Sequence, residues 1–319
     1  MRQKAVIDCD AGVDDALALI LAFHSPELEV EAVTAVNGNV PLDRVFENIQ
    51  KVLSLIQPDD KPLIARGAEG PLQGKPVYAY SFHGKDGLGG AKLFQEAGKE
   101  YCQIFPGRAD DLFLELANQH PGEIVLIATG PLTNVASGFQ RDPGTMRGLK
   151  EVVIMGGAVR TRGNITPVAE FNFFVDPVAA KIVLGSGLPI TLVPLDITHR
   201  VFLTPQIMEE RVKPIDNPSS RFVVEATGYD PIKQRFRLMS GTFHLHDPLA
   251  VGVVIDRTIV KKEKLALQVE TRGGEHYGQV LEVPGDPKIE TCLEVNSEKF
   301  LELFLSMLSL HRVDLSLQP

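Results

Sequence analysis

Along most of the chain, short apolar runs alternate with stretches in which apolar and polar residues recur at helical spacing. The apolar runs are rich in β-branched residues and hold few polar positions, which is typical of strands covered on both faces. The predicted strands lie at residues 5–10, 30–37, 61–67, 123–130, 149–157 and 189–198. The predicted helices between them lie at residues 14–25, 41–56 and 131–139. This alternation predicts a doubly wound α/β fold, with a mainly parallel sheet flanked by helices.

The C-terminal third follows a different pattern. A mostly helical, polar segment at 204–245 precedes an apolar helix at 246–255. A two-strand ribbon (265–271 with 277–283) and a closing helix (297–308) follow it.

No repeat, low-complexity tract or linker interrupts these elements, and we therefore predict a single domain over residues 1–319. Two glycine-rich stretches, at about 68–108 and 158–171, are predicted to be loop insertions. Loops of that length often wall or cover a binding site. In doubly wound sheets the ligand binds outside the carboxyl ends of the strands, so the functional residues are expected there.

Composition and charge narrow the class of partner. The chain has a net charge of −9 and no basic stripe, which argues against nucleic acid and favours a small-molecule substrate. Its N-terminal apolar runs are too short to cross a bilayer, and Asp8 interrupts the one that would resemble a signal peptide, so neither a membrane span nor secretion is expected. Cys9, Cys102 and Cys292 form no CxxC pair, which indicates reduced thiols in a cytoplasmic protein.

The stretch VIDCDAGVDDALALI, residues 6–20, places four carboxylates between an apolar strand and an apolar helix. Strand alternation points Asp8 and Asp10 to one side, and Asp14 and Asp15 fall in the first helical turn. The helix dipole stabilises each of those charges by only about 0.3–1 kcal/mol, whereas a divalent cation neutralises the whole cluster. Because the ligands are hard oxygens, Ca²⁺ or Mg²⁺ is expected. The alternative is that Asp14 or Asp15 caps the helix while the strand aspartates are exposed.

The motif FHLHDPLA puts His246 and Asp247 ahead of the apolar helix. Asp247 either caps that helix or joins the N-terminal cluster as a further oxygen ligand. In the second case His246 lies beside the cluster as a proton donor.

A loop between a strand and a helix carries Asn164, Glu170 and Asn172. Amides together with one carboxylate are suited to recognising several sugar hydroxyls. Phe171 and Phe173 alternate with these residues and either wall a pocket or fill the core.

Further polar residues follow other strands. Asn37 and Asn39 stand in TAVNGNV, Thr129 stands in IATGPLTN with a backbone carbonyl to offer a cation, and His83 lies in the flexible loop FHGKDGLGG. Taken singly, each is equally explained by a turn or a helix cap.

Taken together, these residues resemble the inosine–uridine-preferring nucleoside hydrolase family. The resemblance runs along nearly the whole chain, in order, through DCDAGVDDALA, NGNV, HGKDGLGG, TGPLTNVA, IMGGAV, AEFNFFVDPVAA and HDPLA. It implies a doubly wound α/β fold, one calcium ion per subunit, and hydrolysis of the N-glycosidic bond of ribonucleosides to free base and ribose. Homo-dimers or homo-tetramers are the family's habit and are expected here.

The resemblance also implies a role for each matching residue. Calcium ligands would be Asp10, Asp15, the Thr129 carbonyl and Asp247. Ribose hydroxyls would be held by Asp14, Asn39, Glu170 and Asn172, in a pocket also lined by Met155, Asn164 and Phe171. Asp8 would support the site through hydrogen bonds. His83 and His246 would lie near the base.

The expected mechanism passes through an oxocarbenium-like transition state. Calcium would hold the 2′- and 3′-hydroxyls and the attacking water. Asp10 would act as general base, and His246 would protonate the leaving base.

Some positions depart from the family's pattern. Ala11 replaces the usual proline and Asn37 replaces a small residue, and the region 222–240 matches poorly. Tyr229 and Gln234 are therefore only candidate base contacts, and the choice between purines and pyrimidines stays open. The chain has no Trp, which disfavours the branch of the family that stacks purines on tryptophan.

Two other classes of function remain open at this point. A DxD motif after a strand is also found in phosphatases of the haloacid dehalogenase type, although the follow-on lysine and second acidic pair are not evident. A non-catalytic nucleoside- or ribose-binding protein would keep the same pocket.

Overall fold

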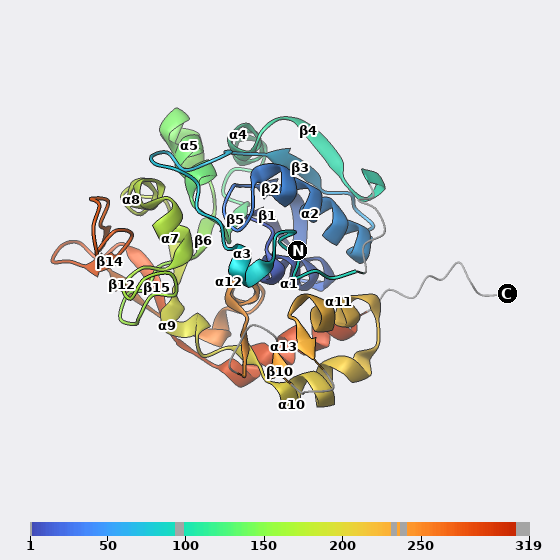
Figure 1. Cartoon of the computed structure of the whole chain (residues 1–319). Coiled ribbons are helices and arrows are strands. Elements are labelled where there is room, and N and C mark those ends of the chain that lie inside the picture. The colour runs from blue at the N-terminus through green and yellow to red at the C-terminus, as the bar shows by residue number, and fades with distance from the viewer. Residues whose placement is uncertain (1, 93–98, 231–234, 237–240, 311–319) are drawn as a thin grey trace.

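The computed structural model describes residues 2–92, 99–230, 235–236 and 241–310, and its centre is one nine-stranded sheet (Figure 1). The strands of this sheet are β1 (Gln3–Cys9), β2 (Leu28–Ala35), β3 (Leu63–Arg66), β4 (Gln103–Arg108), β5 (Val125–Ala128), β6 (Glu151–Met155), β7 (Ile190–Val193), β12 (Val260–Leu265) and β15 (Ile289–Val295). Their order is β12-β15-β7-β6-β5-β1-β2-β3-β4. All neighbours are parallel except β12 and β15.

Helices cover both faces of this sheet, as the alternation in sequence predicts. The longer ones are α1 (Val13–His24), α2 (Leu42–Ile56), α4 (Ala109–Gln119), α5 (Thr133–Arg141), α8 (Pro177–Leu184), α11 (Pro218–Ala226), α12 (His246–Ile255) and α13 (Ser297–Ser309). Successive residues of β1 face opposite cores: Ile7 packs in the cluster with α1, α12 and α13, and Val6 packs in the cluster with α4, α5 and α8. Burying such a side chain stabilises the fold by about 1.5–3 kcal/mol. The predicted fold class is therefore confirmed.

Shorter elements connect these layers. The helical ones are α3 (Tyr80–His83), η1 (Lys99–Tyr101), α6 (Pro143–Met146), α7 (Phe171–Val175), α9 (Leu195–Thr198), α10 (Pro205–Ile207), η2 (Met208–Val212), η3 (Lys213–Ile215) and η4 (Arg257–Ile259). The short strands are β8 (Phe202–Leu203), β9 (Tyr229–Asp230), β10 (Arg235–Phe236), β11 (Phe243–His244), β13 (Leu267–Val269) and β14 (Val280–Glu282). In Figure 1, α10 and α11 lie near α13 at the bottom of the view.

Two sequence predictions need correction. A strand through residue 198 is wrong: β7 ends at Val193, since Pro194 has no N–H to continue the ladder, and α9 begins at Leu195. The stretch 68–108 is not all loop, because its last six residues form β4. The predicted two-strand ribbon is confirmed as the antiparallel pair β13–β14.

Both edge strands of the sheet are irregular. β12 carries the exposed lysines Lys261, Lys262 and Lys264, and its pairing with β15 shifts register between Lys261 and Lys262. β4 contains Pro106, exposes Ile104 by 54%, and pairs with β3 across a second register shift. Charged side chains, proline and bulges are the usual features of edge strands that do not pair further.

The carboxyl ends of β1, β2, β5 and β6 lie side by side in the sheet and hold the predicted functional residues. Among the described helices, none is long and apolar enough to span a membrane.

Candidate active site

A cavity of about 320 Å³ opens at the carboxyl ends of these strands. Its walls include eleven of the residues singled out from the sequence: Asp14, Asn39, His83, Thr129, Met155, Asn164, Glu170, Phe171, Asn172, His246 and Asp247. They come from segments as far apart as residues 14 and 247, so the fold brings together what the sequence separates.

The acidic cluster forms the floor of this cavity. Oxygen atoms of Asp14, Asp15 and Asp247 all lie within 4.8 Å of one another, and all three side chains are buried. Asp10 lies beside them, where its Oδ2 accepts a 2.7 Å hydrogen bond from the backbone N–H of Asn39.

The local chain conformation explains how four carboxylates reach one place. Ala11 adopts φ +32°, and Gly12 then starts α1, its N–H donating to Asp15 Oδ2 at 2.8 Å. The loop after β2 approaches so closely that a Cβ at Gly38 would lie 2.0 Å from Asp10 Oδ2. Only a glycine fits at that position, because any side chain would displace the carboxylate.

Asp8 lies one layer deeper, in β1. Its Oδ1 accepts hydrogen bonds from Thr34 Oγ1 at 2.6 Å and from Asn134 Nδ2 at 2.8 Å. Asn134 also accepts from the backbone N–H of Ala68 at 2.8 Å. Asp8 therefore ties β1 to β2 and α5 beneath the cluster.

Burial raises the pKa of every carboxyl in the cluster, and desolvation is the largest cause for Asp10, Asp14, Asp15 and Asp247. Repulsion from neighbouring aspartates raises the pKa of Asp10, Asp14 and Asp247 further. For Asp14 the pKa rises to about 7. Such shifts mark a site where negative charge is concentrated without compensation from the protein.

The cluster has the properties of a cation site. Asp8 Oδ2, Asp10 Oδ1 and Asp14 Oδ1 are buried and have no hydrogen-bond partner among the described residues. Buried carboxylate oxygens that lack partners are costly, and a bound cation would satisfy them. Because the donors are all oxygens, a hard divalent ion such as Ca²⁺ or Mg²⁺ fits them better than Zn²⁺.

One wall of the cavity is built by the loop before α7. Glu170 caps this helix, accepting from the backbone N–H groups of Asn172 at 2.8 Å and Phe173 at 3.1 Å. Asn172 Nδ2 donates to the Thr129 carbonyl at 2.7 Å, and Asn164 Oδ1 accepts from the Phe171 backbone N–H at 2.9 Å. This wall is rigid and presents amide and carboxylate groups to the cavity.

Another part of the lining, the histidine wall, is formed by His83, His199, His244 and His246. His83 Nδ1 accepts a 3.1 Å hydrogen bond from the Val13 backbone N–H, and His246 Nδ1 lies 2.8 Å from Thr198 Oγ1. His244 stacks on His246, with ring centroids 5.5 Å apart, and His199 meets both rings edge to face. Desolvation lowers the pKa of His246 and lowers that of His83 to about 3.

Several residues of the cavity escaped the sequence analysis: Tyr78, Ala79, Ser81, Phe82, Ile165, His199 and His244. His199 directly follows α9, the short helix after β7. Its position beyond the carboxyl end of a strand is the sequence feature that could have identified it as a site residue. Of the candidate base contacts, Tyr229 does not line the cavity and donates instead to Glu209 Oε1 at 2.9 Å. Gln234 lies outside the described residues. Phe173 is fully buried in the core.

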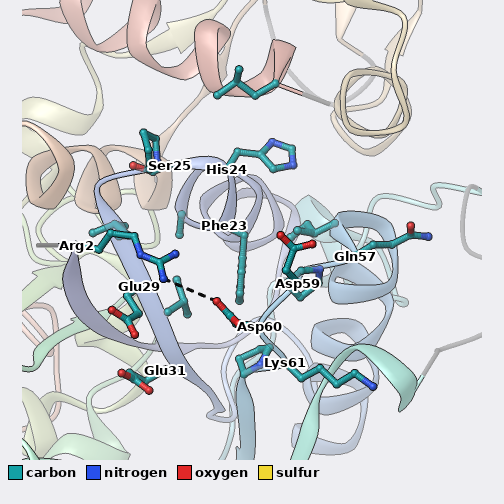
Figure 2. Close-up of a pocket in the computed structure, with 18 residues that line it drawn as sticks. Arg2, Phe23, His24, Ser25, Glu29, Glu31, Gln57, Asp59, Asp60 and Lys61 are labelled. Atoms are coloured by element: carbon teal, nitrogen blue, oxygen red, sulfur yellow. Dashed lines mark ion pairs between the residues drawn. The ribbon is translucent and has the colours of Figure 1, made fainter. Parts of the chain in front are cut away.

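A second, larger cavity, of about 410 Å³, lies near the amino ends of β2 and β3. Figure 2 shows its lining, with the Arg2–Asp60 ion pair of 3.8 Å and with Glu29 and Glu31 on one side. Ligands of doubly wound sheets bind at the carboxyl ends, and the unpartnered aspartate oxygens lie at that end. The smaller cavity is therefore the candidate active site.

Comparison with known proteins agrees with this geometry. The sequence model described as inosine-uridine preferring nucleoside hydrolase matches residues 5–302. The chain is 36% identical over 315 residues to the inosine-uridine preferring nucleoside hydrolase of Crithidia fasciculata, covering 97% of this chain and 98% of that protein. It is 35% identical over 320 residues to the pyrimidine-specific ribonucleoside hydrolase RihA of Enterobacter sp. (strain 638), covering 97% and 98%.

Solved structures give the same answer. A plant nucleoside hydrolase, the PpNRh1 enzyme, matches with a TM-score of 0.89 at 28% identity over 98% of this chain and all of that one. An inosine-guanosine nucleoside hydrolase matches with a TM-score of 0.85 at 30% identity, over 97% and 99%. These matches leave the phosphatase alternative without support. The chain belongs to the inosine-uridine preferring nucleoside hydrolase family and is an N-ribosyl hydrolase.

Proposed function

We propose that the protein hydrolyses ribonucleosides to free base and ribose with one calcium ion at the acidic cluster. The observation that carries this proposal is the set of buried, unpartnered oxygens of Asp10 and Asp14, with that of Asp8 beneath them, in the acidic cluster at the cavity. A bound cation would satisfy these oxygens and place positive charge beside the substrate.

The ion would be held by Asp10, Asp15, Asp247 and the carbonyl of Thr129. The Thr129 carbonyl accepts one hydrogen bond, from Asn172, which leaves a lone pair for a cation. When bound, calcium supplies positive charge that orients the 2′- and 3′-hydroxyls and acidifies the attacking water. Asp10 Oδ1, which has no hydrogen-bond partner among the described residues, would accept the proton of that water.

The sugar would be held by Asp14, Asn39, Glu170 and Asn172, with Met155, Asn164 and Phe171 completing the pocket. Orienting the ribose in this way removes translational and rotational freedom before the reaction. Carboxylates around the ring stabilise the positive charge that develops as the C1′–N bond breaks.

The base would lie against the histidine wall. His246 presents the ring nitrogen that is not bonded to Thr198, and His83 presents the one that is not bonded to Val13. A hydrogen bond from His246 to the departing base offsets the charge that the base acquires.

The decisive experiment measures free base and ribose released from inosine, uridine, adenosine, guanosine and cytidine, with calcium and with EGTA. Release that is lost in EGTA and restored by calcium is expected. Binding without release would favour the nucleoside-binding alternative. Release that is indifferent to EGTA would contradict the role of calcium.

Two further expectations complete the proposal. A homo-dimer or homo-tetramer is expected from the family, and light scattering of the purified protein measures it. Cys9 and Cys292 are buried thiols outside any disulfide of the described residues, which supports the prediction of a reducing, cytoplasmic location.

A further inference from the structure

The hydrogen bond between Thr198 and His246 has two possible directions. Thr198 ends α9, is fully buried, and places its Oγ1 2.8 Å from His246 Nδ1. Either the hydroxyl donates to an unprotonated Nδ1, or a protonated Nδ1 donates to the hydroxyl. In the neutral ring, Nε2 carries the proton and is a donor in the first case. In the second case Nε2 is unprotonated and is an acceptor.

The surroundings of the hydroxyl favour the first case. Among the described residues, the Thr198 hydroxyl has no hydrogen-bond partner besides His246 Nδ1. If Nδ1 carried the proton, the hydroxyl hydrogen would be buried without an acceptor, which disfavours that tautomer. If the hydroxyl donates, both groups are satisfied.

His83 provides a precedent on the same wall of the cavity. Its Nδ1 accepts from the backbone N–H of Val13 at 3.1 Å. A backbone N–H has no choice of direction, so the neutral His83 ring carries its proton on Nε2. Both histidines line the cavity, and with the hydroxyl as donor both neutral rings carry their proton on Nε2.

We propose that Thr198 is a positioning residue that fixes His246 in the tautomer with the proton on Nε2. This inference rests on the proposed function, since Nε2–H is the group that meets the leaving base. The ring plane is held at the same time by His244, which stacks at an interplanar angle of 22°, and by His199 at 68°. With the other tautomer, the lone pair of Nε2 would repel the lone pair that the base gains as the bond breaks.

The test compares Thr198→Val, which keeps the shape but removes the hydroxyl, with Thr198→Ser, which restores it. For Thr198→Val we expect kcat on inosine and uridine to fall about five- to tenfold, the range expected for loss of one net hydrogen bond. On p-nitrophenyl riboside, whose leaving group needs no proton, the rate should stay within about twofold. Thr198→Ser should recover most of the loss on nucleosides.

Thr227→Val is a matched control. Thr227 is also buried, and its Oγ1 donates to the Val223 carbonyl at 2.7 Å in α11, away from the cavity. It should change the rates on nucleosides and on p-nitrophenyl riboside by the same small factor. Equal losses on both substrates in Thr198→Val would overturn the proposal, because they would indicate a general structural role.

A second measurement observes the tautomer directly in the wild-type protein. In the wild-type protein with 15N-labelled histidine, the chemical shifts of the His246 ring nitrogens report which one carries the proton, with His246→Gln used for assignment. We expect a protonated Nε2 and an unprotonated Nδ1, and the reverse pattern would overturn the proposal. A wild-type protein that releases no base from any nucleoside would instead contradict the proposed function and leave the NMR result to decide the tautomer.

Discussion

Replacing Asp247 by Asn tests the interpretation of the acidic cluster as a cation site. The substitution keeps the shape and removes one of three carboxylates whose oxygens lie within 4.8 Å. Two unit charges at that distance repel by about 3.5 kcal/mol at an effective dielectric constant of about 20, which is an upper limit because protonation relieves part of it. Loss of a charge in the first turn of α12 costs at most about 1 kcal/mol.

The lost charge repulsion outweighs the lost interaction with the helix dipole. In the absence of metal, Asp247→Asn is therefore expected to be more stable than the wild type. For 319 residues the entropy of unfolding is about 0.7 kcal/mol per kelvin. A net gain of about 2 kcal/mol then raises Tm in EGTA by about 3 °C. Calcium at about 100 times its Kd stabilises the wild type by about 2.7 kcal/mol, or about 4 °C, and Asp247→Asn should lose most of this gain. The order of the two Tm values therefore reverses when calcium is added.

Differential scanning fluorimetry at pH 8 and at pH 6 measures both effects. The pKa of Asp14 is raised to about 7 in the folded protein, so the folded state binds protons that calcium must displace. The calcium-induced rise in Tm should therefore be larger at pH 8 than at pH 6. Asp60→Asn, an exposed aspartate paired with Arg2, should keep the calcium effect. A wild-type Tm indifferent to calcium, or an Asp247→Asn variant less stable than the wild type in EGTA, would refute the reasoning.

Three further predictions concern activity. Asp10→Ala should lower kcat on uridine and inosine alike by about 10²- to 10⁴-fold with no loss of folded structure by circular dichroism; near-normal rates would end its assignment as general base. His246→Ala should reduce the rate on inosine far more than on p-nitrophenyl riboside, and equal losses would exclude its role toward the leaving base. Gly38→Ala, whose Cβ would lie 2.0 Å from Asp10 Oδ2, should reduce activity on both substrates, whereas Gly273→Ala, with open space around it, should not.

The buried parts of the fold were predictable because burial leaves a strong pattern. The strands β1, β2, β5 and β6 each contain a buried, mostly apolar run, and short runs of this kind between helical patterns indicate strands. The edge strands β4 and β12 were not predicted, because each is exposed and carries proline or lysine instead of apolar residues. They form strands because they pair with a neighbouring strand, and the sequence does not show that pairing.

In the candidate site, too, residues with a sequence pattern were predicted and isolated residues were not. Asp14 and Asp247 were recognised because clustered carboxylates beside apolar elements are costly without a purpose. His199 and His244 were missed, because a single histidine carries no pattern and acquires meaning only when the fold stacks it against His246. Tyr229, a candidate base contact, lies in β9 and bonds Glu209 of η2 outside the cavity lining; its role toward the base stays a prediction.

The irregular edges of the sheet bear on how copies of the chain associate. A second copy that extended the sheet would need a flat strand with free backbone groups, but β12 carries charged side chains, partly ion-paired with β15, and β4 contains a proline. Burying these charges against another strand would be costly, and each register shift twists the edge away from a partner. Any contact between copies is therefore expected to use helices and loops, and the sheet edges are poor templates for fibres.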